Sequence, residues 1–319
     1  MSDILCEFRR AGRIEAVHRV AAAVVAGGRM LLSRGEADVP VFMRSCAKPF
    51  QALAVVETGA ADAFGLSDAE LAVVCGSHSG ERIHVEAVRS ILRKAGLTPA
   101  ALRCGTHQPI SQKGLRDLYG ARREPSAVHN NCSGKHAGML AAARHLEAPV
   151  RTYLDPAHPV QKRNLANVAR FAEVPEREIP IGIDGCSAPN FALPVRAMAR
   201  AIANFCSEGG APARIRVAMT IYPRMVGRFC ADLMLAGRGR IVAKGGAEGA
   251  YLLGLPAQGA GIALKVADGN SRAWPHVLAA LLGKFRLLGK ADLARVERLA
   301  DPVLRNHAGR IVGEVRVQL

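Results

Sequence analysis

Aromatic side chains are scarce in this chain, because Phe, Tyr and Trp make up only 4% of its 319 residues. Proteins that bind single-stranded nucleic acids stack the bases on aromatic side chains, so the scarcity argues against such a platform. The formal net charge is +16, but the basic residues are scattered and form no run of five. We therefore expect no nucleic-acid partner and interpret the charge as a general surface property that would attract anionic substrates or surfaces. A non-catalytic nucleic-acid-binding protein is the rival interpretation, which rests on the charge alone.

Long apolar runs are missing as well. No stretch of 18 or more apolar residues occurs, so we expect no transmembrane helix and no membrane partner. The start of the chain lacks the basic segment and apolar stretch of a secretory signal. The eight cysteines form no C-x-x-C pair, which favours free thiols over a disulfide framework. These absences together predict a cytoplasmic protein.

Lysine is the rarer cation, with nine residues among the 43 basic ones. Three of the nine, Lys48, Lys135 and Lys244, lie in stretches rich in Gly, Ala and Ser. The pKa of a lysine amine falls readily on desolvation, whereas a guanidinium stays charged. Where arginine is the usual cation, a lysine in such a stretch suggests a use for its amine.

The segment Arg44-Ser45-Cys46-Ala47-Lys48-Pro49-Phe50 has a hydroxyl three residues before an amine, at a predicted helix start. Residues three apart on a helix share one face, so Lys48 can lie against Ser45. The apolar sequence that follows predicts a buried helix, and a lysine that leads into a buried helix needs a reason. A Ser-Lys pair is a minimal acyl-transfer arrangement. The alternative is a capped, solvated helix start.

Two further segments combine glycines with reactive side chains. The first is Cys75-Gly76-Ser77-His78-Ser79-Gly80, which is either a ligand-binding turn or a polar strand-to-helix turn. The second is His129-Asn130-Asn131-Cys132-Ser133-Gly134-Lys135-His136, which contributes little to a core and therefore indicates a site. Its thiol and its nitrogens lie within one helical turn, a spacing that suits zinc. The alternative is a helix N-terminus rich in capping residues.

Three later segments offer partners for these groups. Asp184-Gly185-Cys186-Ser187-Ala188-Pro189-Asn190 places a carboxylate and a thiol in a Gly/Pro-rich loop, which could complete a metal site with Cys132. Lys244 ends a short predicted strand before two glycines, and Lys265 lies in a similar strand. The class A β-lactamases and penicillin-binding proteins pair a helix-borne Ser-x-x-Lys with a lysine on a C-terminal strand, and this chain has the same order of parts.

The residue patterns predict strands at both ends of the chain and helices between them. We expect an α+β or α/β fold in which both ends share one mixed sheet flanked by helices. The whole chain, 1–319, is expected to form a single domain, with two lobes possible and a helical middle over about 45–235. The expected elements are a hairpin over 17–33; helices near 45–56, 81–95, 132–146, 160–172, 191–204, 212–222 and 272–288; loops over 104–125 and 181–190; and strands over 240–244, 250–255, 261–266 and 309–317.

Six segments together resemble the inducible, Rhizobium etli-type L-asparaginase family, L-asparaginase II. They span nearly the whole chain in the family's order, and they are RSCAKPFQAL, CGSHSGE, HNNCSGKHAGML, DGCSAPNFALP, IVAKGGAEGAY and ALKVADGN. The resemblance implies a serine-lysine amidohydrolase with a fold similar to serine β-lactamases, penicillin-binding proteins and serine-type glutaminases. It also implies a homodimer.

The resemblance further implies the roles of particular residues. Two Ser-Lys tandems would share the site, Ser45 with Lys48 and Ser77 with Lys244. Zn²⁺ would be bound beside them, orienting the substrate rather than acting directly in catalysis. The implied zinc ligands are Cys132, Lys135 and Cys186. Substrate-binding or ligand-supporting roles fall on Arg44, His78, Asn131, His136 and Asp184.

The implied reaction is the hydrolysis of L-asparagine to L-aspartate and ammonia, the activity of an L-asparaginase (EC 3.5.1.1). Lys48 would take the proton of Ser45, which attacks the side-chain amide, and water would release the acyl group. Alternatives are a glutaminase or another serine-lysine amidase, including a β-lactam-reactive hydrolase. The chain departs from the family at Met225–Cys230, where the loop before the second-tandem lysine is a few residues shorter.

Overall fold

The computed structural model describes residues 2–319, which divide into two compact units. Unit 1 comprises residues 2–46, Leu193–Ser207 and Asp232–Leu319, and unit 2 comprises Ala47–Ala192 and Glu208–Ala231. No helix within residues 2–319 is both long and apolar enough to span a membrane.

Unit 1 is built on an eight-stranded sheet that joins the two ends of the chain. The strand order is β10-β11-β1-β2-β9-β8-β7, with β3 also paired to β2, and neighbouring strands run antiparallel. The strands are β1 (Ile4–Arg10), β2 (Arg13–Ala26), β3 (Arg29–Arg34), β7 (Val242–Gly245), β8 (Ala250–Leu255), β9 (Ala260–Val266), β10 (Val303–Arg305) and β11 (Ile311–Gln318). The expectation that both ends of the chain share one sheet is confirmed.

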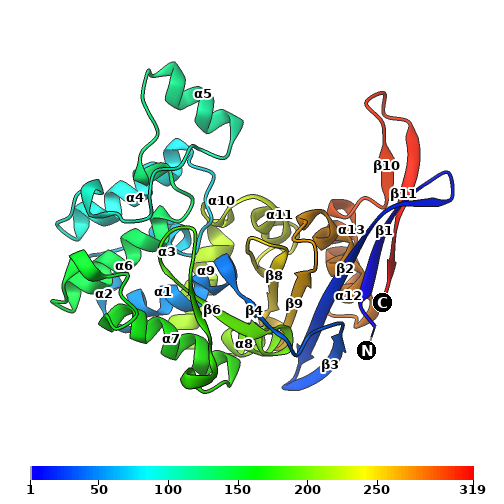
Figure 1. The fold of residues 1–319 in the computed structure, drawn as a ribbon, viewed down its shortest axis with the longest axis horizontal. Helices are drawn as coiled ribbons and strands as arrows, with labels where there is room; N and C mark the ends of the chain where they lie inside the picture. Colours follow the sequence, from blue (N-terminus) through cyan, green and yellow to red (C-terminus); the bar gives the residue numbers. More distant parts are fainter. Residues whose placement is uncertain (1) are drawn as a thin grey trace. The chain divides into compact units, whose positions relative to one another are not determined.

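Three helices of unit 1 flank this sheet (Figure 1). They are α8 (Val195–Ser207), α12 (Trp274–Lys284) and α13 (Lys290–Leu299). Helix α8 packs on β2, β8 and β9, while α12 contacts β1, β11 and α13. The predicted class, a sheet flanked by helices, is confirmed.

Unit 2 is mainly helical. Its helices are α1 (Lys48–Glu57), α2 (Ala60–Ala63), α3 (Asp68–Val74), α4 (Arg82–Lys94), α5 (Gln112–Gly120), α6 (Ser133–His145), α7 (Pro159–Ala172), α9 (Gly210–Ile221) and α10 (Pro223–Val226). A hairpin of β5 (Ile181–Ile183) and β6 (Pro189–Pro194) adds two strands, and β6 and α11 (Arg228–Ala236) cross the unit boundaries. The short strand β4 is Pro40–Phe42, and the 3-10 turns are η1 (Arg44–Ala47), η2 (Pro99–Ala101), η3 (Ala127–His129), η4 (Val150–Thr152), η5 (Glu176–Glu178), η6 (Pro256–Gln258) and η7 (Ser271–Ala273).

Helix α6 is the central element of unit 2. It contacts α1, α3, α4 and α7, and its residues from Ser133 to Ala143 are buried. Two glycines permit the close approach to α3. A Cβ at Gly134 would overlap the Val73 carbonyl oxygen, and one at Gly138 would lie 2.8 Å from Val74 Cγ1. The close packing holds the motif that begins α6 against the motif that follows α3.

Three expected elements differ from the structure. One of the two interpretations of Cys75–Gly80 is a strand-to-helix turn, and it is wrong about the element before it, which is α3: Ser67 and Glu70 form a reciprocal capping box that starts this helix at Asp68. The expected loop over 104–125 contains α5, whose first turn is capped by Ser111. The expected loop over 181–190 includes β5 and the start of β6, which pair with each other.

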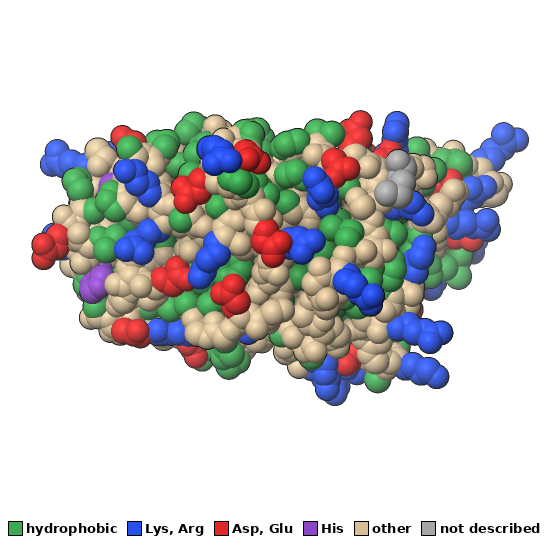
Figure 2. Space-filling model, turned by 90° about the horizontal axis from the view of Figure 1, so that it is seen from below, with side chains coloured by type: hydrophobic (Ala, Val, Ile, Leu, Met, Phe, Trp, Pro, Cys, Tyr) green, Lys and Arg blue, Asp and Glu red, His purple; other side chains and the backbone are tan. Residues whose placement is uncertain are grey.

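Figure 2 shows the charged side chains of one face. Over much of this face Lys and Arg side chains alternate with acidic and apolar groups, and toward the right-hand end of the view they are more frequent than acidic groups.

Packing of α8 on the sheet gives a test of the fold. A Cβ at Gly261 of β9 would overlap the Ala199 carbonyl oxygen and lie 2.7 Å from the Ala203 nitrogen. Gly261→Ala should therefore lower the free energy of unfolding by about 1–3 kcal/mol, measured by urea denaturation. The control is Gly283→Ala in α12, where the nearest atom would be 3.7 Å away. It should be neutral or stabilising by up to about 1 kcal/mol. Equal stability of the two variants would contradict this account of the packing.

Candidate active site

The buried Lys48 amine contacts two of the motifs, the segment that carries Ser77 and the segment that carries Asn131. Lys48 opens α1, directly after the η1 turn that carries Ser45, and its side chain is 1% exposed. Its Nζ donates hydrogen bonds to the Gly76 carbonyl oxygen at 2.6 Å, to Ser77 Oγ at 2.9 Å and to the Asn131 carbonyl oxygen at 3.4 Å. Lys48 therefore contacts Ser77 directly, whereas the resemblance assigns Ser77 to Lys244.

Ser77 is held by the residues around Val226 and Gly227. Its backbone N–H donates to the Val226 carbonyl oxygen at 2.9 Å. Gly227 has a φ of +111°, and a Cβ there would lie 2.6 Å from the Ser77 carbonyl oxygen. Only glycine suits this position, because both the backbone conformation and the close approach exclude a side chain. The chain at Val226 and Gly227 thus contacts the Ser77 segment closely.

His78 fastens the Ser77 loop to the start of α6. It is fully buried, its Nδ1 accepts from the Gly80 N–H at 3.2 Å, and its Nε2 lies 2.8 Å from Ser133 Oγ. Because Nδ1 accepts, Nε2 carries the proton and donates to Ser133. Burial, followed by the charges of His84 and Lys48, holds the pKa of His78 well below its usual range. His78 is thus a neutral positioning group.

A second cluster in unit 2 joins Cys132, Lys135 and Cys186, the three residues implied as zinc ligands. All three are buried, at 5%, 2% and 4% exposed. Lys135 Nζ donates to Cys186 Sγ at 3.1 Å, and the Cys132 thiol lies 3.1 Å from Asn131 Oδ1. Asp184 Oδ2 lies 3.8 Å from Cys186 Sγ. The fold thus brings together segments that are 50 residues apart in the sequence.

The charges in this cluster depend on each other. A hydrogen bond from Cys186 lowers the pKa of the Cys132 thiol well below its usual value, aided by the positive charges of Lys48 and Lys135. That same hydrogen bond, together with burial, raises the pKa of Cys186. Burial opposes the charge of Lys135, but the two sulfur atoms outweigh it and raise its pKa. The shifts favour the ionised form of Cys132 and the charged form of Lys135.

The donor set of this cluster fits a zinc ion. Sulfur and nitrogen donors are the ligands that Zn²⁺ prefers, and binding would require Lys135 to lose its proton. Among residues 2–319 there is no group of three or more His, Cys, Asp or Glu side chains placed to hold a metal. The implied ligands Cys132, Lys135 and Cys186 do not form such a group, because one of the three is a lysine.

His136 forms a hydrogen bond with Tyr153, a residue that was not predicted from the sequence. Its Nδ1 lies 2.6 Å from Tyr153 Oη, which also accepts from the Arg103 N–H at 2.9 Å. Burial raises the pKa of Tyr153, so the phenol stays protonated and donates to His136. The one available signal was that Tyr153 is one of only four tyrosines. Its role depends on tertiary packing and could not be found by spacing.

Ser45, Arg44 and Lys244 belong to unit 1, where their segments lie side by side. The Cys46 thiol donates to the Lys244 carbonyl oxygen at 3.2 Å. A Cβ at Gly246 would lie 2.9 Å from the Met43 carbonyl oxygen, so glycine allows the η1 turn to approach the end of β7. The Lys244 side chain is 1% exposed, and its Nζ donates to the Gly245 carbonyl oxygen at 2.6 Å. Arg44 lies 3.7 Å from Glu248, in the same part of unit 1.

Comparison with known proteins gives one match to a family and several to solved structures. The chain matches the L-asparaginase II family over residues 6–317. No curated protein matches it. A crystal structure of Mglu in its native form is 17% identical with a TM-score of 0.47, covering 85% of this chain and 66% of that chain. A second Mglu structure has 61% of its chain covered, so this chain spans about two thirds or less of these two proteins. A class C β-lactamase is 14% identical with a TM-score of 0.41, covering 79% of this chain and 88% of that one.

The burial of His78 predicts how stability depends on pH. The ordinary pKa of histidine is 6.5, and that of folded His78 is well below it. As the pH falls below 6.5 the unfolded chain takes up a proton that folded His78 does not, so the free energy of unfolding should decrease. His78→Asn removes this contribution and should make the pH slope of stability between 7 and 5 shallower, as measured by urea denaturation. His307→Asn, at an exposed histidine, is the control and should keep the wild-type slope. An unchanged slope in His78→Asn would contradict this assignment.

Proposed function

Because this chain belongs to the L-asparaginase II family and is therefore an amidohydrolase, we propose that it hydrolyses L-asparagine to L-aspartate and ammonia through a serine-bound acyl intermediate. The observation that supports a serine-lysine mechanism best is the hydrogen bond of 2.9 Å between the buried Lys48 amine and the Ser77 hydroxyl. A solvent-exposed lysine would stay charged, whereas a desolvated one can act as a base.

The first step starts from the deprotonated form of Lys48, whose neutral amine takes the hydroxyl proton of Ser45, and Ser45 Oγ attacks the amide carbon of asparagine. Backbone N–H groups at the start of α1 stabilise the oxyanion, because that end of a helix carries positive potential. The C–N bond then breaks, the nitrogen takes up a proton and ammonia leaves. The result is an ester between Ser45 and the β-carboxyl group of aspartate.

The second Ser-Lys tandem carries the proton. Ser77 passes a proton from Lys48 to the leaving nitrogen, a role that fits its contact with the Lys48 amine. Lys244, buried in unit 1, is the partner of Ser77 in this relay. Water then attacks the ester, Lys48 accepts a proton from that water, and the same groups return the proton to Ser45 as aspartate is released.

Cys132, Lys135 and Cys186 would hold the zinc ion, with Asp184 beside Cys186. The ion would supply a positive charge that attracts the α-carboxylate of the substrate. His136 and Asn131, next to this cluster, would orient the substrate. The protein acts as a cytoplasmic homodimer in this proposal.

The first test measures ammonia release from L-asparagine and L-glutamine by the wild type and by Ser45→Ala. Asparagine should be the better substrate, but one methylene in a pocket is worth only about 1–3 kcal/mol, so a glutaminase is the competing outcome. Ser45→Ala should abolish turnover and leave no acyl-enzyme in mass spectra. An adduct trapped on Ser77 would overturn the assignment of the nucleophile. If folded wild-type protein released no ammonia from either amide, the proposed substrate would be wrong.

A matched pair of substitutions on two strands of the same sheet tests whether Lys244, but not Lys265, contributes to catalysis. Lys244→Ala should lower kcat by roughly 10²–10⁴-fold, the usual contribution of a proton-transfer group. Lys265→Ala removes a lysine whose Nζ bonds the Val266 carbonyl oxygen, and it should leave kcat unchanged. Similar losses in the two variants would indicate a structural effect on the sheet.

Removal of metal gives a separate test of the thiol-amine cluster. Metal-depleted protein should keep its kcat and show a raised KM for asparagine, because the ion orients the substrate. Adding Zn²⁺ back should restore the KM of the metal-depleted wild type but should not restore it in Cys186→Ser. Complete loss of turnover on metal depletion would point instead to a metal-activated water.

A further inference from the structure

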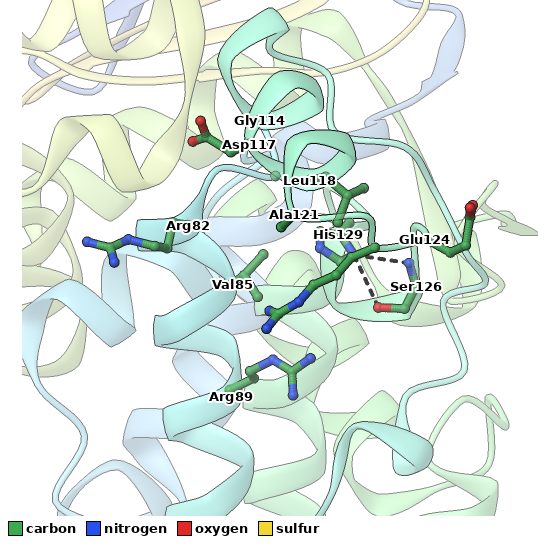
Figure 3. A pocket seen from close by; sticks show the side chains of 12 residues that line it. Arg82, Val85, Arg89, Gly114, Asp117, Leu118, Ala121, Glu124, Ser126 and His129 are labelled. Carbon is green, nitrogen blue, oxygen red and sulfur yellow. Dashed lines mark hydrogen bonds between the residues drawn. The ribbon is translucent and has the colours of Figure 1, made fainter.

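Unit 2 contains a pocket whose lining includes none of the three residues of the thiol-amine cluster. It has a volume of about 550 Å³, and its walls are α4, α5 and the chain from Ala121 to His129. Its size is within the range of pockets that hold small organic ligands. Figure 3 shows its lining, which combines arginines with the apolar side chains of Val85, Leu118 and Ala121.

The pocket floor is formed by two glycines in close contact with a polar loop. Gly80 has a φ of +77°, and a Cβ there would lie 2.8 Å from Pro109 Cα and 3.2 Å from the His129 carbonyl oxygen. A Cβ at Gly114 would lie 2.9 Å from Pro109 Cβ. Ser79 fixes the loop before α5, because its carbonyl oxygen accepts from the backbone N–H groups of Ile110 and Ser111. The cavity is therefore built into the fold by tight backbone packing.

Two arginines in the pocket are available to a ligand. Arg89 and Arg123 line it, and across residues 2–319 neither of them forms an ion pair with a carboxylate. The other charged groups of the lining are occupied or turned away. Arg82 pairs with Glu86 at 3.6 Å, and Asp117 pairs with Lys113 at 2.7 Å.

Figure 3 shows how the groups around Arg89 are directed. Val85 and Arg89 point from α4 toward Ser126 and His129, while the carboxylate of Glu124 lies on the far side and points away. Ser126 Oγ lies 3.1 Å from His129 Nδ1. Burial, and then the positive charge of Arg89, lower the pKa of His129, so this ring is neutral beside the guanidinium. The cationic side of the pocket therefore has a hydroxyl, and within residues 2–319 neither Arg89 nor Arg123 forms an ion pair.

We propose that this pocket binds a small organic phosphate of about mononucleotide size. The phosphate lies between the Arg89 and Arg123 guanidinium groups, which match phosphate oxygens in bidentate geometry. The body of the ligand lies on Val85, Leu118 and Ala121. A dicarboxylate has the same kind of charge but would leave most of the volume and the apolar wall unused.

The position of the pocket connects it to the proposed active site. Gly80 belongs to the loop that carries Ser77 and His78, and His129 begins the motif that carries Cys132 and Lys135. The His78 N–H donates to the Asn131 carbonyl oxygen at 3.2 Å, which links the two segments. A ligand between these walls therefore changes the affinity for the amide substrate. This second part of the proposal rests on the proposed function.

The binding test titrates AMP, adenosine, inorganic phosphate and succinate into the full-length protein by isothermal calorimetry. AMP should bind, and adenosine, inorganic phosphate and succinate should bind at least tenfold more weakly. Arg89→Gln and Arg123→Gln should each weaken AMP binding about tenfold or more, the effect of losing one charge-assisted contact. Arg93→Gln, at an exposed arginine on α4 outside the pocket, is the matched control and should bind AMP as the wild type does.

Three results would overturn the proposal. The first is the absence of any heat of AMP binding at millimolar concentration. The second is that Arg93→Gln weakens AMP binding as much as the pocket substitutions do, which would mean general attraction to a basic surface. The third is that succinate binds as tightly as AMP. Circular dichroism of each variant establishes that it is folded.

Ammonia release with and without AMP then tests the connection between the pocket and the proposed active site. The KM for asparagine should shift at least twofold in the wild type and stay constant in Arg89→Gln. If AMP binds but no amide is hydrolysed, the pocket assignment stands and the proposed function fails.

Discussion

A lysine amine removed from water must find hydrogen-bond acceptors, and this requirement at Lys48 organises the helical unit. Its partners include the Gly76 and Asn131 carbonyl oxygens and the Ser77 hydroxyl, which come from two different loops. Leaving a buried ammonium or amine without partners costs several kcal/mol, so these loops are held in place by the same group they surround. A side chain suited to proton transfer is thus also a structural centre.

Close backbone packing makes that arrangement possible. Gly134 and Gly138 let α6 approach α3, and Gly227 lets the following chain approach Ser77. His78 adds a fixed connection between the loop after α3 and Ser133. Because these contacts are made by backbone atoms and buried groups, they hold the loop that carries Ser77 and His78 against α6.

Several features could be predicted because they depend on local sequence. The amphipathic pattern of α4 and the glycine turn between β2 and β3 follow from short-range preferences. The Ser-x-x-Glu sequence at the start of α3 is visible in the chain, yet the apolar run that follows it left a strand-to-helix turn open as one interpretation. Short apolar runs are ambiguous in this way, since buried helices and buried strands share their composition.

The sequence by itself determined which reactive residues this protein possesses, which of them lie within one helical turn of each other, and that both ends of the chain form strands. Tertiary structure alone decided which distant segments meet. Lys48 contacts Ser77, Lys135 contacts Cys186 and His136 contacts Tyr153, at separations of 29, 51 and 17 residues. No periodicity encodes such contacts. They arise because burying the apolar faces of α1, α3 and α6 together forces each buried polar group to find its partner on a neighbouring element.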